Sequence, residues 1–176
     1  LLNSNYTVFL AGEESGSQKN YTAQMTLIKT LNKNYNVTEL LFELPHSLCI
    51  RLNEYMEAGS EETLDGVFEV MPKNHLANNK SAKEFFRKLK DYNDGLTQNK
   101  KLHLNGLDAE LSDATVKNAI VILQNIVSEI KEVPEDLQDN WLKLSNLKSD
   151  VNYSASSLKE VFGDLQDDIE LSKNSL

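Results

Sequence analysis

The sequence predicts an α/β fold in which a parallel or mixed sheet is flanked by helices. Three short apolar runs are rich in residues that favour strands, and each has a carboxylate at or just after its end. These runs are Tyr6–Ala11, Val37–Leu44 and Leu102–Leu107. Helical patterns separate the runs, which favours parallel strands joined by right-handed crossovers. Three strands make a small sheet, so we expect an incomplete domain or a core completed by the C-terminal helices.

The first two elements are predicted from a β-rich run followed by a helical stripe. Tyr6–Ala11 is almost wholly apolar, which is typical of a central parallel strand. A glycine-containing loop, Gly12–Lys19, follows it. Asn20 is placed to cap a helix over residues 21–34. The side chains predicted to face the sheet recur at i, i+3 and i+4 spacing. They are Ala23, Thr26, Leu27, Thr30 and Leu31.

The next elements complete the α/β part, which we assign to residues 1–110. Val37–Leu44 is predicted as a second strand that Pro45 ends, because proline has no N–H for a ladder. Ser47 is placed to cap a helix that reaches residue 58. A further helical pattern covers residues 61–71, and Ser81 with Glu84 matches a capping box that opens a helix to residue 92. Leu102–Leu107 is the third predicted strand.

Residues 111–176 are predicted to be helical throughout, as a cap on the α/β part or an insertion in it. Ser112 is placed to cap a helix over residues 113–131. Pro134 suits the first turn of a second helix that contains Trp141, and residues 154–176 carry a third helical stripe. Such apolar stripes suit either the protein's own core or the surface of a partner helix.

Composition excludes several classes of function. The net charge is −9 and the pI is about 4.8, so we expect no nucleic-acid partner. No apolar run approaches the roughly 18 residues of a membrane span. Cys49 is the single cysteine, which rules out an internal disulfide. Its apolar helical surroundings predict a buried, inert thiol. A cytoplasmic and a secreted location both agree with this composition, which leaves the oligomeric state open.

The carboxylates near the strand ends are the main functional signal. Glu13 and Glu14 follow the first predicted strand, Glu43 lies in the second, and Asp108 follows the third. Because the carboxyl ends of parallel strands meet at one edge of a sheet, we expect these side chains to converge there. Converging carboxylates can hold a divalent metal, act as a general base or bind a cationic substrate. The alternative is that they are exposed loop acids in a chain with 27 acidic residues.

Other nucleophile and metal motifs are weak in this chain. Ser15 follows the two glutamates without a strand-Ser-helix elbow around it, and the sequence has no P-loop and no His-x-x-x-His pair. His46 follows Glu43 across Pro45 and can approach the same edge. For each of the three histidines, including His75 in a loop and His103 within a strand, a structural role is the favoured interpretation.

Five short motifs occur in the order found in erythromycin-esterase-like proteins, and together they span much of residues 6–125. The chain resembles that family, which belongs to a superfamily with the ChaN-like haem-binding proteins and the TIKI/TraB proteases. The resemblance implies a mostly uncharacterised bacterial hydrolase family with a parallel or mixed sheet, flanking helices and a helical insertion. The motifs are Gly12-Glu13-Glu14-Ser15-Gly16, Leu41-Phe42-Glu43, Asn53-Glu54-Tyr55 with Gly59, Asp91-Tyr92-Asn93 and Gly106-Leu107-Asp108.

The resemblance also implies roles for individual residues. The family motif is Gly-Glu followed, after one or two residues, by a histidine that activates water. Its glutamate corresponds to Glu13, and a second family glutamate corresponds to Glu43. The motif histidine would fall on Ser15 or Gly16, and neither is a histidine here. A later catalytic histidine of the family lies downstream of this chain.

Three functions follow from these observations. The first is an esterase-like hydrolase, active or inactive, in which Glu13 or Glu43 activates water, with a divalent metal as one option. Glu14, Ser15, His46 and Asp108 would then bind a small-molecule substrate. The second is a non-catalytic module that binds a polar or cationic ligand at the same edge. The third is a helical protein-interaction domain in which residues 113–176 make the contacts and the sheet is a scaffold.

Overall fold

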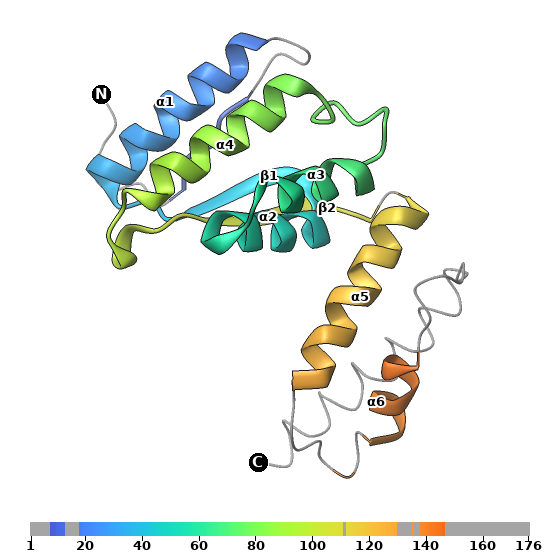
Figure 1. Cartoon of the computed structure of the whole chain (residues 1–176). Helices are drawn as coiled ribbons and strands as arrows, with labels where there is room; N and C mark the ends of the chain where they lie inside the picture. Colours follow the sequence, from blue (N-terminus) through green and yellow to red (C-terminus); the bar gives the residue numbers. More distant parts are fainter. Residues whose placement is uncertain (1–7, 13–17, 111, 130–134, 136–137, 147–176) are drawn as a thin grey trace. The chain divides into compact units, whose positions relative to one another are not determined.

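The computed structural model describes residues 8–12, 18–110, 112–129, 135 and 138–146. The chain divides into two compact units, Leu1–Leu111 and Ser112–Leu176, and each is described by itself. Figure 1 shows the elements in chain order. They are α1 (Gln18–Tyr35), β1 (Glu39–Pro45), α2 (His46–Ala58), α3 (Glu61–Val70), α4 (Lys80–Asp94), the 3-10 turn η1 (Gln98–Lys100), β2 (His103–Asp108), α5 (Asp113–Glu129) and α6 (Gln138–Ser145).

The sheet of the first unit consists of two parallel strands, β1 and β2. Glu39 lies opposite His103 at the start of the register, and Pro45 lies opposite Asp108 at its end, after one irregularity. Helices α2, α3 and α4 follow β1 in the chain and lead back to β2. The predicted α/β class and the parallel pairing are therefore confirmed, in a sheet smaller than the three strands expected.

The first predicted strand is absent from its described part. Val8–Gly12 has no regular secondary structure, and Tyr6 and Thr7 lie outside the described residues. Val8 is 72% exposed and Leu10 is 96% exposed. The ring of Phe9 contacts that of Tyr35, with centroids 5.5 Å apart. The run has strand-like residues, but a strand also needs a hydrogen-bonded neighbour, and no described backbone group pairs with this segment.

One face of the sheet is buried and the other is exposed. The side chains of Leu40, Phe42 and Leu44 alternate with exposed ones along β1, and Leu44 is fully enclosed. Phe42 contacts the rings of Phe85 and Phe86 of α4, with centroids about 6 Å apart. Helix α4 therefore covers this face of the sheet. The core cluster that includes it takes side chains from α1, α2, α3, α4 and both strands.

The buried stripe of α1 differs from the prediction. Ala23, Thr26 and Thr30 are exposed, Leu27 is half-buried, and only Leu31 of the predicted set is buried. The Thr26 and Thr30 hydroxyls donate to backbone carbonyls four residues earlier, so the outer face needs no partner element. The helix instead buries a neighbouring stripe, and it packs against α4. That stripe consists of Met25, Ile28, Leu31 and Asn32.

Three predicted caps are displaced. Helix α1 begins at Gln18, so Asn20 lies inside it. Ser47 is the second residue of α2, and Pro45 occupies the capping position without a side-chain hydrogen bond. Asn79, and not Ser81, caps α4, because its Oδ1 accepts the Ala82 N–H at 2.9 Å. In each case the chain enters the helix two or three residues before the predicted signal.

Buried amides connect the helices to the sheet. Asn32 of α1 donates to the carbonyls of Val37 and Lys100 and accepts the Tyr92 hydroxyl, each at 2.9 Å. Asn36 has a φ of 55°, which lets α1 end and the chain turn into β1. Asparagine tolerates this conformation better than most residues. These contacts fix the position of α1 and α4 relative to the start of each strand.

The second unit contains α5 and α6, which contact each other. Ser112 caps α5 as predicted, since its hydroxyl oxygen accepts the Thr115 N–H at 3.2 Å. Residues 130–134 and 147–176 lie outside the described part, together with the third predicted helix. In the part of the chain that the structure describes, no helix combines the length and apolarity that a membrane crossing requires.

Candidate functional site

The carboxyl edge of the sheet brings three of the predicted site residues into one region. Because β1 and β2 run parallel with Pro45 opposite Asp108, both strands end at the same edge. Glu43 lies two residues before that point and is exposed. His46, also exposed, is the first residue of α2. Asp108 is half-buried, and its Oδ1 accepts the N–H of Ala109 at 2.8 Å.

The other predicted site residues cannot be placed at this edge. Glu13, Glu14 and Ser15 lie outside the described residues, together with Gly16. The convergence of Glu13 with Glu43 and Asp108 therefore remains a prediction. Of the predicted site residues, the structure describes two carboxylates and one imidazole at this edge.

A carboxylate that the sequence reasoning missed occupies the start of α2. Glu110 Oε1 accepts the backbone N–H of Ser47 at 3.1 Å, and Oε2 accepts the Ser47 hydroxyl at 3.0 Å. The first turn of a helix carries unpaired N–H groups and the positive end of the helix dipole, so it attracts negative charge. Glu110 supplies the cap that Pro45 lacks. Glu110 lies two residues after Asp108, the carboxylate at the end of β2, and this position was the sequence signal that could have identified it.

Gly106 allows this edge to be compact. A Cβ added to Gly106 would lie 2.7 Å from the backbone N and Cα of His46, closer than such atoms approach. The backbone at the start of α2 thus passes directly over β2, and a side chain at this position would push it away. The glycine of the Gly106-Leu107-Asp108 motif therefore has a packing role next to the candidate site.

Cys49 lies one turn into α2 and is fully buried, as the sequence predicted. Burial, with a smaller contribution from the negative charge of Glu110, raises the pKa of its thiol to about 12. A thiol with so high a pKa stays protonated at neutral pH, which makes it a poor nucleophile and metal ligand. Cys49 is therefore part of the core and not of the candidate site.

A second polar cluster lies at the opposite, amino end of the strands. Glu39 Oε2 is 3.3 Å from His103 Nδ1 and accepts the Asn105 amide at 2.8 Å. Asn53 Nδ2 is 3.1 Å from His103 Nε2. Because Nδ2 only donates, His103 Nε2 accepts and its Nδ1 carries the proton that faces Glu39. His103 is exposed, as the sequence allowed, and both ring nitrogens have partners, which favours a structural role.

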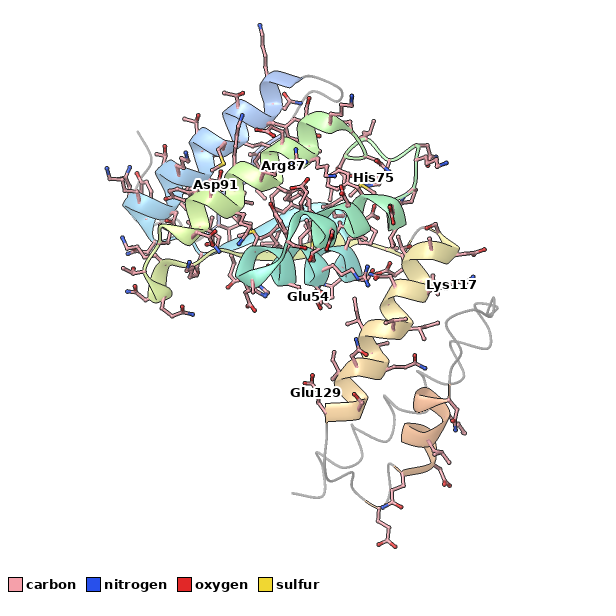
Figure 2. All side chains as sticks on the ribbon, viewed as in Figure 1. Glu54, His75, Arg87, Asp91, Lys117 and Glu129 are labelled. Carbon is pink, nitrogen blue, oxygen red and sulfur yellow. The ribbon has the colours of Figure 1, made fainter. Side chains whose placement is uncertain are left out.

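His75 also has a structural role. It lies in the loop between α3 and α4 (Figure 2), where its Nδ1 accepts the Ala77 N–H at 3.1 Å. The backbone N–H of His75 donates to the carbonyl of Pro72 at 2.9 Å. The amide of Asn78 donates to the carbonyls of Phe68 in α3 and of Met71 and Pro72 in the loop, the shortest contact being 2.9 Å to Met71. His75 therefore stabilises a turn, and nothing connects it to the carboxyl edge.

Charged side chains join α3 to α4 away from the edge. Arg87 projects from α4 (Figure 2) and pairs with Glu61, while Lys83 pairs with Asp65 and Glu61. Hydrogen bonds from Arg87 lower the pKa of Glu61 below its ordinary value, and the same contacts raise the pKa of Arg87. The carboxylates of these pairs are exposed, so solvent screens them. They are surface links between helices.

No group of three or more His, Cys, Asp or Glu side chains lies close enough to hold a metal ion within the described ranges. Glu43 and Asp108 alone offer too few donors for a metal site made only of protein ligands. A shallow depression in the surface lies on the outer face of α1 and contains no carboxylate or histidine. The depression lies on a single helix and is lined mainly by threonines and small apolar groups, so we assign it no function.

Comparisons with protein-family models, with curated proteins and with solved structures each found no match. The resemblance to erythromycin-esterase-like proteins therefore rests on the five motifs alone. The first motif lies almost entirely outside the described residues. The functional assignment consequently depends on the geometry of the carboxyl edge.

Proposed function

We propose that the chain is a ligand-binding α/β domain in which the carboxyl edge of the sheet takes a small polar or cationic molecule. Glu43, His46 and Asp108 are its proposed contacts. The observation that carries this proposal is the parallel register of β1 and β2, with Pro45 opposite Asp108. Ligands of open α/β sheets bind in the crevice beyond the carboxyl ends of the strands.

The charge of the edge favours a cationic group over an anionic one. An anion would ordinarily be attracted to the start of α2. The carboxylate of Glu110 already accepts the Ser47 N–H and hydroxyl there. The carboxylates of Glu43 and Asp108 are the other negative groups of the proposed site. A ligand that carries an ammonium or guanidinium group would pair with them.

The second candidate is the hydrolase that the family resemblance implies. Glu43 would then activate water, with Glu13 as a second carboxylate, Glu14 and Ser15 near the substrate, and His46 as the imidazole of the edge. The presence of His46 beside the strand ends favours this candidate. Against it, Glu43 is exposed, and a carboxylate base depends on burial to become effective at neutral pH. Binding is therefore the better supported function.

Thermal unfolding in the presence of candidate ligands tests the proposal. The panel contains putrescine, spermidine, arginine and, as anionic controls, citrate and phosphate. A bound ligand at roughly 100 times its Kd stabilises the fold by about 2.7 kcal/mol. We expect an increase in Tm with the cations that Glu43→Gln and Asp108→Asn remove. Glu57→Gln, an exposed glutamate further along α2, is the matched control and should keep the increase.

The same variants separate the two candidates. If hydrolysis of a p-nitrophenyl ester is measurable and falls in Glu43→Gln with the Tm effect of ligands unchanged, the hydrolase is the correct assignment. If neither ligand stabilisation nor hydrolysis depends on Glu43 or Asp108, the carboxyl edge is not the functional site.

A further inference from the structure

One of the two backbone edges of strand β1 has no hydrogen-bond partner among the described residues. The N–H of His103 donates to the carbonyl of Thr38 at 2.8 Å, which fixes the phase of the β1–β2 ladder. Alternate residues of a strand turn their backbone groups to opposite sides. The outward-facing groups of β1 therefore belong to Glu39, Leu41 and Glu43. Among the described residues, no backbone or side-chain group forms a hydrogen bond with these outward N–H and C=O groups.

Side chains pair with part of the outer edge of β2 and with Leu102, the residue that precedes it. Asn53 of α2 accepts the Leu104 N–H and donates to the Leu104 carbonyl, both at 2.9 Å. Asn93 of α4 accepts the Leu102 N–H at 2.7 Å. Two amides thus pair with the β2 side of the sheet, whereas the outer edge of β1 has no such partner among the described residues. An open strand edge is a template for a further strand.

The side chains along the open edge have a symmetric pattern. Glu39, Leu41 and Glu43 project from the same, uncovered face of the sheet, because their positions are two residues apart. Leu41 is 60% exposed, and Leu107 on the neighbouring strand is 68% exposed. An added strand would place alternate side chains beside this acidic–apolar–acidic set. The order of the set is the same in both directions, so a parallel and an antiparallel partner would meet the same pattern.

A second copy of the chain does not fit this edge. Two β1 strands related by a two-fold axis through Leu41 would run antiparallel. Glu39 of each would then lie opposite Glu43 of the other, and like charges directly opposite one another destabilise a sheet. The chain's own Val8–Gly12 is mostly exposed and forms no hydrogen bond with β1. The charge pattern therefore points to a different protein with basic residues.

We propose that β1 binds an extended segment of another protein by strand addition. That segment carries an apolar side chain flanked, two residues away on each side, by lysine or arginine. Backbone hydrogen bonds to Glu39, Leu41 and Glu43 provide the pairing, and the opposite charges fix the register. The net charge of −9 adds a general attraction for a basic segment.

Two synthetic peptides test the proposal on the full chain. The first has the order Thr-Lys-Thr-Val-Thr-Lys-Thr, and the second replaces both lysines with glutamate; both are blocked at their ends. Isothermal titration at low salt should give binding of the lysine peptide that is at least about tenfold tighter than that of the glutamate peptide. The double variant Glu39→Lys with Glu43→Lys should reverse the preference.

A backbone variant separates strand addition from simple charge attraction. The N–H of Leu41 points outward, so Leu41→Pro removes a donor of the open edge without removing a β1–β2 hydrogen bond. Proline is tolerated in edge strands in this orientation. Leu41→Thr keeps the donor and is the matched control. We expect Leu41→Pro to lose peptide binding, Leu41→Thr to keep it, and both to unfold cooperatively.

Three results would overturn the proposal. One is unchanged peptide binding in Leu41→Pro, which would mean that charge alone is responsible. Another is a concentration-dependent dimer in sedimentation that Leu41→Pro abolishes, which would make a second copy the occupant. The third is slow hydrogen exchange of the Leu41 amide in the free chain, which would mean that the chain's own residues already cover the edge. Fast exchange of the Leu41 amide that becomes slow when the lysine peptide is added would support the proposal.

Discussion

The side chain of Asn53 pairs with both backbone groups of Leu104, accepting its N–H and donating to its carbonyl at 2.9 Å each. The amide of α2 thus takes the place of a neighbouring strand at the outer edge of β2. Leu104 is fully buried, so water cannot replace Asn53 as its partner. Asn53 thus satisfies the outward backbone groups of Leu104, in the middle of β2.

Replacing Asn53 should cost the protein a large part of its stability. Asn53→Leu keeps the size of the side chain but leaves the buried Leu104 N–H and carbonyl unpaired, at about 1–3 kcal/mol for each group. We expect a loss of roughly 2–4 kcal/mol in urea unfolding. Glu54→Ala, at the exposed neighbouring position, should change the free energy of unfolding by less than about 0.5 kcal/mol. Equal effects of the two substitutions would contradict the role of the amide.

Gly106 should be intolerant of even a methyl group. In Gly106→Ala the new Cβ meets the backbone of Leu44 and His46, neither of which can move without shifting α2 from β2. We expect a loss of at least about 1–3 kcal/mol in unfolding free energy. Gly95→Ala is the control, because Gly95 has right-handed helical angles and room for a Cβ. It should be neutral or stabilise by about 0.4–1 kcal/mol.

The ion pairs between α3 and α4 should make stability depend on pH in the acid range. The pKa of Glu61 is lower in the folded chain than its ordinary value, first because of its hydrogen bonds with Arg87. A group with a lowered folded pKa binds its proton more readily when unfolded, so its contribution is present above the unfolded pKa, near 4.5. That contribution is lost as the pH falls through the folded value.

Glu61→Gln should therefore lower Tm at pH 7 and have no such effect near pH 2. The difference should be small and should shrink in 1 M salt, because Glu61 and Arg87 are both well exposed. Glu62→Gln, at the next exposed position, should leave the pH profile unchanged. A Tm difference that is the same at both pH values would show that Glu61 contributes by packing and not by charge.

The thiol of Cys49 should react only when the chain unfolds. Its pKa of about 12, raised mainly by burial, leaves almost no thiolate at pH 8, and the thiolate is the reactive form. We expect labelling with 5,5′-dithiobis(2-nitrobenzoate) to be slow in buffer and to rise along the urea unfolding curve. Rapid labelling of the folded chain would mean that α2 opens locally or that the thiol is accessible.

Local sequence signals identified most of the described elements. The strands β1 and β2 appeared as short runs of residues that favour strands, and Pro45 ended the first of them because of its missing N–H. The buried thiol was likewise predictable from its apolar neighbours. The run that contains Val8 carried the same signal and is not a strand in its described part. Propensity reports how a residue fits a sheet, whereas a strand also needs a partner with free backbone groups.

The candidate site was predictable only in part. The order of strands and helices implied that Glu43 and Asp108 end at one edge, and the parallel register agrees with this. Glu110 was missed because the residue that caps α2 lies 63 residues from Ser47 in the chain, so the sequence around Ser47 gives no sign of it. The Glu39–His103 contact was missed for the same reason.

The sequence by itself predicted the α/β class, favoured parallel strands and placed carboxylates near the strand ends. These properties depend on apolar periodicity, on the order of the elements and on charge, all of which are local or additive along the chain. Only the tertiary structure decided which backbone groups are paired: Asn53 pairs with Leu104 of β2, Glu110 caps α2, and the outer edge of β1 has no partner within the described part of the chain. The physical reason is that a hydrogen bond depends on distances of about 3 Å between atoms that the chain brings together only when it folds.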